Sequence, residues 1–193
     1  MALLIAGLIV FLGVHSLRIV ADDWRSAQIA RIGLLPYKAI YSTVSLLGLA
    51  LIVVGYGQAR TASVLLWDPP LWLRHVSALL MLFAFVLLAA AYVPRNRLRY
   101  AVGHPMVLGV KVWAAGHLLA NGHLSDLLLF GGFLAWAAFD YRAARRRDRI
   151  HGRIRARATL AGDVATVVVG AAAWAAFALH LHGWLIGVRP FVG

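Results

Sequence analysis

Six long apolar runs, separated by short polar segments, dominate this sequence. They cover residues 2–20, 39–57, 73–93, 105–120, 124–141 and 161–187. At 1.5 Å per helical residue, several of them can cross a hydrocarbon layer of about 30 Å. The chain is 62% hydrophobic and 13% charged, whereas an average soluble domain is about 45–50% apolar and about 25% charged. The sequence therefore predicts an all-α fold: a polytopic membrane helix bundle of about six transmembrane helices, forming one domain over residues 1–193.

The basic residues predict how this bundle is oriented. All but four of the 19 lysines and arginines lie on one side of the predicted bundle: Arg18 at the end of the first run, and the others between the first and second runs, between the third and fourth, or between the fifth and sixth. The exceptions are Arg60, Arg74, Arg189 and Lys111. Because basic loops are retained in the cytoplasm, we expect those three loops inside and both termini outside.

Composition also narrows the classes of function. The net charge of +12 could suggest nucleic acid, but the basic residues lie between apolar runs, so we expect no nucleic-acid partner. The arginines at 142–157 could contact anionic membrane lipid, although topology alone explains such a run. Cysteine and glutamate are absent, which excludes thiolate metal sites and glutamate-bridged metal pairs.

The run at 105–120 is the leading candidate for a functional helix. Lys111 lies within it, and a cation inside a bilayer is costly enough to call for a role. His104 is seven residues away, so the two share a helical face. Trp113, His117 and Asn121 form a second face. His104 precedes Pro105 and should lie at the helix N-cap, where the helix dipole favours the neutral imidazole that can bind a metal.

Depth in the membrane decides which histidines could meet. The first helix runs inward and the fourth outward, so His15 and His104 should lie at similar depth. His75, His117 and His180 could form another cluster near the outer side. A haem b needs two axial imidazoles at matching depth, and either set satisfies this. Each histidine could equally be an interfacial or capping residue.

The segment GHPMVLGVKVWAAGHLLANG at 103–122 closely resembles the NnrU family of bacterial membrane proteins. Further matching motifs follow in order: VHSLR at 14–18, YKAIYSTVSLLGL at 37–49, PPLWLRH at 69–75, FGGFLAWAAFDYR at 130–142 and HGWLIGV at 182–188. This resemblance implies a protein of the bacterial inner membrane associated with nitrite and nitric oxide reduction, that is, with denitrification.

The plant zeta-carotene isomerases, relatives of that family, share the HS segment and the HP segment with its following Trp, His and Asn. That resemblance implies haem b held by His15 and His104, with His117 as the alternative second ligand. The HP-x-x-x-G pattern at 104–109 also resembles isoprenylcysteine carboxyl methyltransferases. Those enzymes have a downstream glutamate segment, and this chain has no glutamate.

Three hypotheses follow. The first is an inner-membrane protein that binds haem b, or another redox metal, and assists nitrogen-oxide respiration or performs a haem-dependent isomerisation. The second is a non-enzymatic transport factor, or an assembly factor for respiratory reductase components, with Lys111 and the histidines lining a path. The third is a structural subunit in which the polar stripes serve hydrogen bonds between helices.

Overall fold

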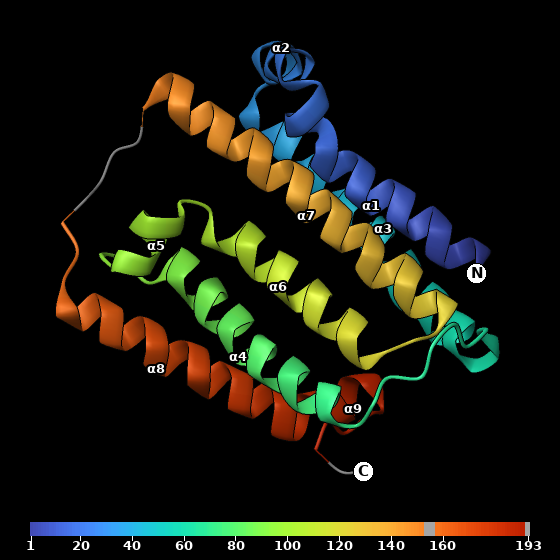
Figure 1. Ribbon diagram of the computed structural model, residues 1–193. Coiled ribbons are helices and arrows are strands. Elements are labelled where there is room, and N and C mark those ends of the chain that lie inside the picture. Colours follow the sequence, from blue (N-terminus) through green and yellow to red (C-terminus); the bar gives the residue numbers. More distant parts are fainter. Residues whose placement is uncertain (153–156, 192–193) are drawn as a thin grey trace. The chain divides into compact units, whose positions relative to one another are not determined.

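The computed structural model describes residues 1–152 and 157–191, and this part of the chain is almost entirely helical (Figure 1). The long helices are α1 (Ala2–Val20), α3 (Leu34–Ala59), α4 (Trp72–Tyr92), α6 (Pro105–Ala120), α7 (Leu124–His151) and α8 (Leu160–Ala176). The shorter ones are α2 (Asp22–Ile32), η1 (Arg60–Ala62), α5 (Arg97–Val102), η2 (Phe177–Leu181) and α9 (His182–Ile186). The predicted all-α class is confirmed.

Five helical segments among the described residues are long and apolar enough to cross a membrane. They are α1, α3 with η1, α4, α7 and the continuous stretch from α8 to α9. The expected sixth span, α6, is apolar but has only 16 residues. At 1.5 Å per residue it is about 24 Å long, slightly less than a typical hydrocarbon core. The chain is thus built as a multi-pass membrane protein.

The chain forms two compact units. The first contains Met1–Asp68 and Gly122–Asp140, and the second contains Pro69–Asn121 and Tyr141–Gly193.

Glycines hold α1 against α3 in the first unit. A Cβ added at Gly7 would lie 2.6 Å from the backbone nitrogen of Ile52, and one added at Gly48 would lie 2.8 Å from that of Phe11. Because the later residue of α1 faces the earlier residue of α3, the two helices are antiparallel. Such close approach of two backbones requires small residues.

Residues 124–140 of α7 belong to the first unit, and they pack on α1. A Cβ added at Gly132 would lie 3.5 Å from Leu12, and the rings of Phe11 and Phe133 are 5.7 Å apart. The polar segment before α7 is held by its backbone: Leu66 donates to the carbonyl of Gly122 at 2.8 Å, and Leu124 donates to that of Val64 at 2.9 Å. Three helices of this unit therefore have a fixed register around His15.

In the second unit, α4 lies between α6 and α8 (Figure 1). A Cβ at Gly109 would lie 3.2 Å from the carbonyl oxygen of Ala84, and one at Gly170 would lie 2.6 Å from Cα of Val86. The small residues that the sequence places on α6 and α8 are thus packing positions.

Several helices extend beyond the predicted runs. The segment 22–32, expected as loop, forms α2, because its polar residues are compatible with a helix and Asp22 and Asp23 occupy the favourable first turn. It ends at Gly33, whose φ of 88° interrupts the helix before α3. α7 continues about ten residues past Tyr141, because arginine has good helix propensity. A search for apolar runs overlooks such segments.

Candidate functional site

His15 is the histidine most closely enclosed by aromatic rings in the first unit. Its Nδ1 lies 2.7 Å from the carbonyl oxygen of Phe11, one turn earlier on α1. Its ring stacks on Phe11 at 4.2 Å between centroids, and it meets the rings of Tyr41 at 5.2 Å and Trp136 at 6.0 Å edge-on. The half-buried imidazole is thus oriented by residues from α1, α3 and α7.

The hydrogen bond to Phe11 determines which ring nitrogen of His15 can act as a ligand. Because a carbonyl oxygen only accepts, Nδ1 carries the proton and Nε2 presents its lone pair. Nε2 has no hydrogen-bond partner within residues 1–152 and 157–191. A metal-binding histidine commonly donates its second N–H to a backbone carbonyl or a carboxylate, which fixes the tautomer.

His104 lies in the second unit, at the N-cap of α6 and directly before Pro105, as predicted. Its side chain does not cap the helix. Nε2 instead lies 3.1 Å from Oδ2 of Asp148 on α7, and Arg145 donates to the same oxygen at 3.4 Å. The predicted position is confirmed, but the imidazole is held by a carboxylate that we did not predict.

Tyr141 supports this arrangement. Its hydroxyl donates to the carbonyl of Val102 at 2.8 Å, and its ring meets that of His104 edge-on at 6.5 Å. The C-terminal part of α7 is thereby fastened to the start of α6. The sequence offered one signal for this contact: Asp148 is the one acid inside the basic run at 142–157.

Trp113, His117 and Asn121 come together on α6, as their spacing predicts. Nδ1 of His117 lies 3.0 Å from the carbonyl oxygen of Trp113, and the two rings are 5.1 Å apart. The Asn121 side chain donates to the carbonyl of His117 at 2.8 Å. The side chains of His117 and Asn121 therefore each contact a backbone carbonyl four residues earlier. Nδ1 of His15 makes the same kind of contact on α1.

Lys111 lies on the side of α6 away from α4, because it is two positions from Gly109, or about 200° around the helix. It is half-buried. All seven aspartates of the chain are among the described residues, and Lys111 has no ion pair with any residue of that part. The cation inside the predicted span thus lacks a protein counter-ion there.

His15 and His104 are not equally suited to bind a haem iron. His15 offers Nε2, the nitrogen far from Cβ, in an aromatic setting, and so fits an axial position. His104 has Nε2 occupied by Asp148 and offers only Nδ1, where the adjacent Cβ crowds a porphyrin plane. Within the described residues, no three or more His or Asp side chains group as a metal site. The predicted cluster of His75, His117 and His180 therefore does not form a three-histidine metal site.

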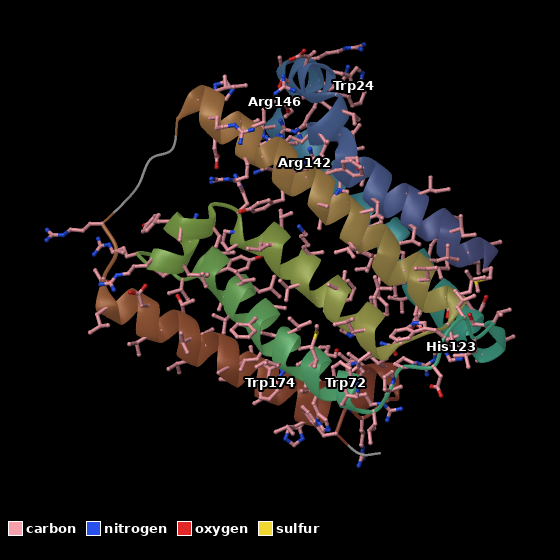
Figure 2. The ribbon with its side chains drawn as sticks, in the orientation of Figure 1. Trp24, Trp72, His123, Arg142, Arg146 and Trp174 are labelled. Carbon is pink, nitrogen blue, oxygen red and sulfur yellow. The ribbon has the colours of Figure 1, made fainter. Side chains whose placement is uncertain are left out.

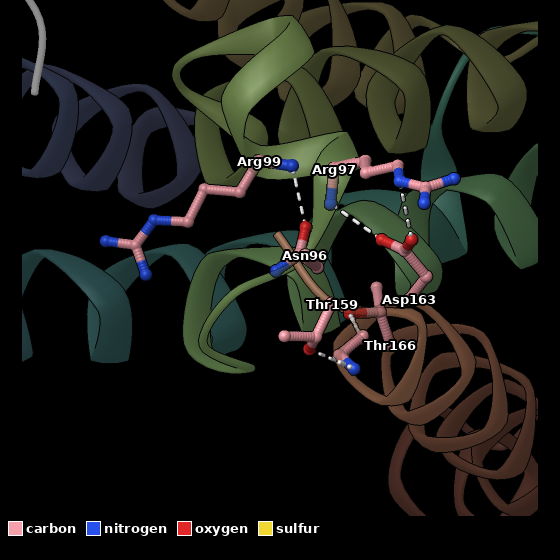
Figure 3. Close-up of polar contacts among 7 residues, drawn as sticks. Asn96, Arg97, Arg99, Thr159, Asp163 and Thr166 are labelled. Carbon is pink, nitrogen blue, oxygen red and sulfur yellow. Dashed lines mark hydrogen bonds and ion pairs between the residues drawn. The ribbon is translucent and has the colours of Figure 1, made fainter. Parts of the chain in front are cut away.

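Other polar contacts of the second unit build its structure (Figure 3). Asp163 on α8 accepts from the backbone nitrogen of Arg97 at 2.6 Å and pairs with its guanidinium at 3.3 Å. Asn96 is fully buried, caps α5 by accepting from the Arg99 nitrogen at 2.7 Å, and donates to the carbonyls of Ala90 and Val93. These contacts tie the α4–α5 turn to the start of α8.

The predicted basic segment forms the C-terminal part of α7, where Arg142 and Arg146 are exposed (Figure 2). Arg153 and Arg155, which belong to the same run, lie outside the described residues.

Comparison with known proteins supports the resemblance drawn from the motifs. The family model described as NnrU protein matches residues 3–190, nearly the whole chain. No curated protein and no solved structure matches it. A match of this extent covers every helix described above, and the chain therefore belongs to the NnrU family.

Proposed function

We propose that this protein binds haem b in the bacterial inner membrane through His15 and, in that form, supports nitrite and nitric oxide reduction. Family membership supports the setting. The observation that carries the proposal is the geometry of His15, whose Nδ1 lies 2.7 Å from the Phe11 carbonyl while Nε2 remains available to iron. A haem-dependent isomerisation would use the same site.

The surroundings of His15 suit this role. Phe11, Tyr41 and Trp136 hold the imidazole between three helices, so that it cannot turn away from its carbonyl partner without losing ring contacts. These rings cover part of the half-buried imidazole. When bound, haem would supply a one-electron redox centre. The chain supplies the imidazole, its tautomer and the aromatic rings that orient it.

The resemblance implies a second histidine ligand, which would be His104 or His117. The predicted depth favours His104, which must then bind through Nδ1 or leave Asp148. The resemblance also allows His117, whose ring is oriented by the contact of its Nδ1 with the Trp113 carbonyl oxygen at 3.0 Å. Single alanine variants would separate the two, because only the variant that removes a ligand should shift or abolish the Soret band.

The test is an absorption spectrum of the protein purified in mild detergent after expression with sufficient haem. We expect a Soret band that is lost or strongly shifted in His15→Ala. His151→Ala is the matched control, because His151 is an exposed histidine at the end of α7. A wild-type protein without a Soret band, or a band unchanged in His15→Ala, would contradict the proposal.

Lys111 supports an alternative in which the protein moves an anion or assists assembly of a reductase without haem. Its half-buried ammonium has no counter-ion among the described residues, and intramembrane cations commonly mark substrate or ion paths. This alternative predicts a haem-free protein whose Lys111→Met variant loses anion uptake or reductase activity in cells. Lys38→Met serves as control, because Lys38 is exposed near the start of α3.

A further inference from the structure

A groove on the second unit lies between α5 and the first two turns of α8. Its apolar wall is formed by Leu98 and Ala101 of α5 and by Val167 of α8. The volume of the groove is about 330 Å³, at the lower end of the range of about 300–1,000 Å³ that is usual for ligand sites. Ala101 and Val167 are exposed, so the groove opens at the surface of the protein. It can hold part of a molecule, such as the upper part of a hydrocarbon chain.

The buried polar side chains of this groove are bonded within the protein. The side-chain amide of Asn96, fully buried, makes its hydrogen bonds to backbone groups of α4, α5 and the turn between them. The Thr166 hydroxyl donates to the carbonyl of Gly162 at 2.7 Å. Buried polar groups that are already paired gain nothing from a polar ligand. This part of the groove therefore suits a hydrocarbon chain.

One end of the groove carries a cation and an anion side by side. Nε of Arg97 lies 3.3 Å from Oδ2 of Asp163, and Oδ1 of Asp163 accepts from the Arg97 backbone nitrogen at 2.6 Å. The terminal nitrogens of the guanidinium extend beyond this ion pair (Figure 3). The Arg97 and Asp163 side chains are 75% and 24% exposed, and each carboxylate oxygen can accept a second hydrogen bond. Both charges are thus accessible to a ligand.

The order of these groups along α8 matches the order of headgroup and acyl chain in a lipid leaflet. Asp163 lies in the first turn of α8, and Val167 is four residues further into the candidate membrane span, a rise of about 6 Å. The paired charges therefore lie nearer the membrane surface than the apolar wall does. In the predicted orientation, this surface is the cytoplasmic one.

We infer that this groove binds one phosphatidylethanolamine molecule, with the upper part of an acyl chain on the apolar wall. The lipid phosphate accepts from the terminal nitrogens of Arg97, and the primary ammonium donates to Asp163. A net anionic headgroup would lie beside Asp163 without an ammonium to balance that carboxylate, and a choline headgroup has no N–H to donate. The inference concerns the second unit alone, and it does not depend on the binding of haem.

Native mass spectrometry of the detergent-purified protein tests the choice of lipid. The probes are dioleoyl phosphatidylethanolamine, dioleoyl phosphatidylglycerol and dioleoyl phosphatidylcholine, which share their acyl chains and differ in headgroup. We expect the first to bind about 5- to 10-fold more tightly than the other two, because the paired charges are partly solvated. Equal retention of all three lipids would mean that an acyl chain alone selects the groove. That result, a preference for the anionic lipid, or no retention at all would overturn the inference.

Two neighbouring valines of α8 test the position of the lipid. Val167 lines the groove and Val168 lies outside it, and they are similarly exposed, at 55% and 59%. Val167→Phe should abolish the preference for phosphatidylethanolamine, because the larger side chain fills the groove. Val168→Phe should leave that preference unchanged. An unchanged preference in Val167→Phe, or an equal loss in both variants, would place the lipid elsewhere and contradict the inference.

Arg97→Met tests the headgroup contact without filling the groove. The variant keeps an unbranched apolar side chain and removes the guanidinium, so phosphatidylethanolamine should bind about 3- to 10-fold more weakly. Arg95→Met is the matched control, because Arg95 is also exposed in the turn before α5 but lies outside the groove. It should leave the affinity unchanged. Wild-type affinity in Arg97→Met, or the same loss in Arg95→Met, would show that Arg97 does not recognise the headgroup and would overturn the inference.

Discussion

Nε2 of His104 lies 3.1 Å from Oδ2 of Asp148, which joins the first residue of the α6 motif to the arginine-rich end of α7. The two side chains are 32% and 17% exposed, so solvent screens the pair only in part. We expect Asp148→Asn to lower the free energy of unfolding in detergent by about 1 kcal/mol, less than a fully buried charged hydrogen bond. Thermal or denaturant unfolding measures this change.

The matched control for that prediction is Asp22→Asn. Asp22 also pairs with an arginine three residues away, but its side chain is 42% exposed, and such surface pairs contribute little. A double-mutant cycle between His104→Ala and Asp148→Ala should show coupling, because the residues are in direct contact. Additive effects in that cycle would mean that the contact does not stabilise the protein.

The packing of α1 on α3 predicts opposite outcomes for two glycines of the same helix. A Cβ at Gly7 would meet the backbone of Leu51 and Ile52, whereas one at Gly13 would have nothing within 4 Å. We expect Gly7→Ala to cost about 1–3 kcal/mol through overpacking. Gly13→Ala should be neutral or stabilising by up to about 1 kcal/mol, because alanine favours the helix. Equal melting temperatures for the two variants would contradict this register.

The outline of the fold could be predicted from the sequence because each span is a local property. A long run of apolar residues favours a helix in a bilayer, since a helix satisfies all its backbone hydrogen bonds within the one segment. The N-cap at His104 and the stripe from Trp113 to Asn121 were equally predictable, because they depend on spacing within one helix. α2 and the long end of α7 were not, because their polar residues carry no hydropathy signal.

The surroundings of the candidate ligands could not be predicted, because they depend on register between helices. Asp148 is 44 residues from His104, and nothing local links them. Trp136 and Tyr41 reach His15 from separate helices. The sequence identified His15 because it lies within an apolar run, and His104 because it directly precedes one. Only packing shows that one is held by a carbonyl and aromatic rings, and the other by a carboxylate.

Tyr56 and Asp126 form a polar pair within the first unit. The Tyr56 hydroxyl donates to Oδ1 of Asp126 at 2.6 Å, and Asp126, 4% exposed, also accepts from the backbone nitrogen of His123 at 3.0 Å. Tyr56→Phe leaves a buried carboxylate with one donor fewer, so we expect a loss of about 1.5–3 kcal/mol in unfolding free energy. Tyr92→Phe should have no measurable effect, because Tyr92 is 74% exposed. Similar stability of both variants would rule out a structural role for the pair.

The distribution of basic residues predicts the sidedness of the chain, and the absence of cysteine makes this directly measurable. Ser26 on α2 and Thr61 in η1 are both exposed, and they lie at opposite ends of α3. The predicted orientation places Ser26 in the cytoplasm and Thr61 outside. In intact cells with a permeable outer membrane, a membrane-impermeant maleimide should label Thr61→Cys and not Ser26→Cys. After lysis both should react, which shows that each cysteine is accessible. Labelling of Ser26→Cys alone in intact cells would reverse the orientation, and labelling of both would mean that α3 does not span the membrane.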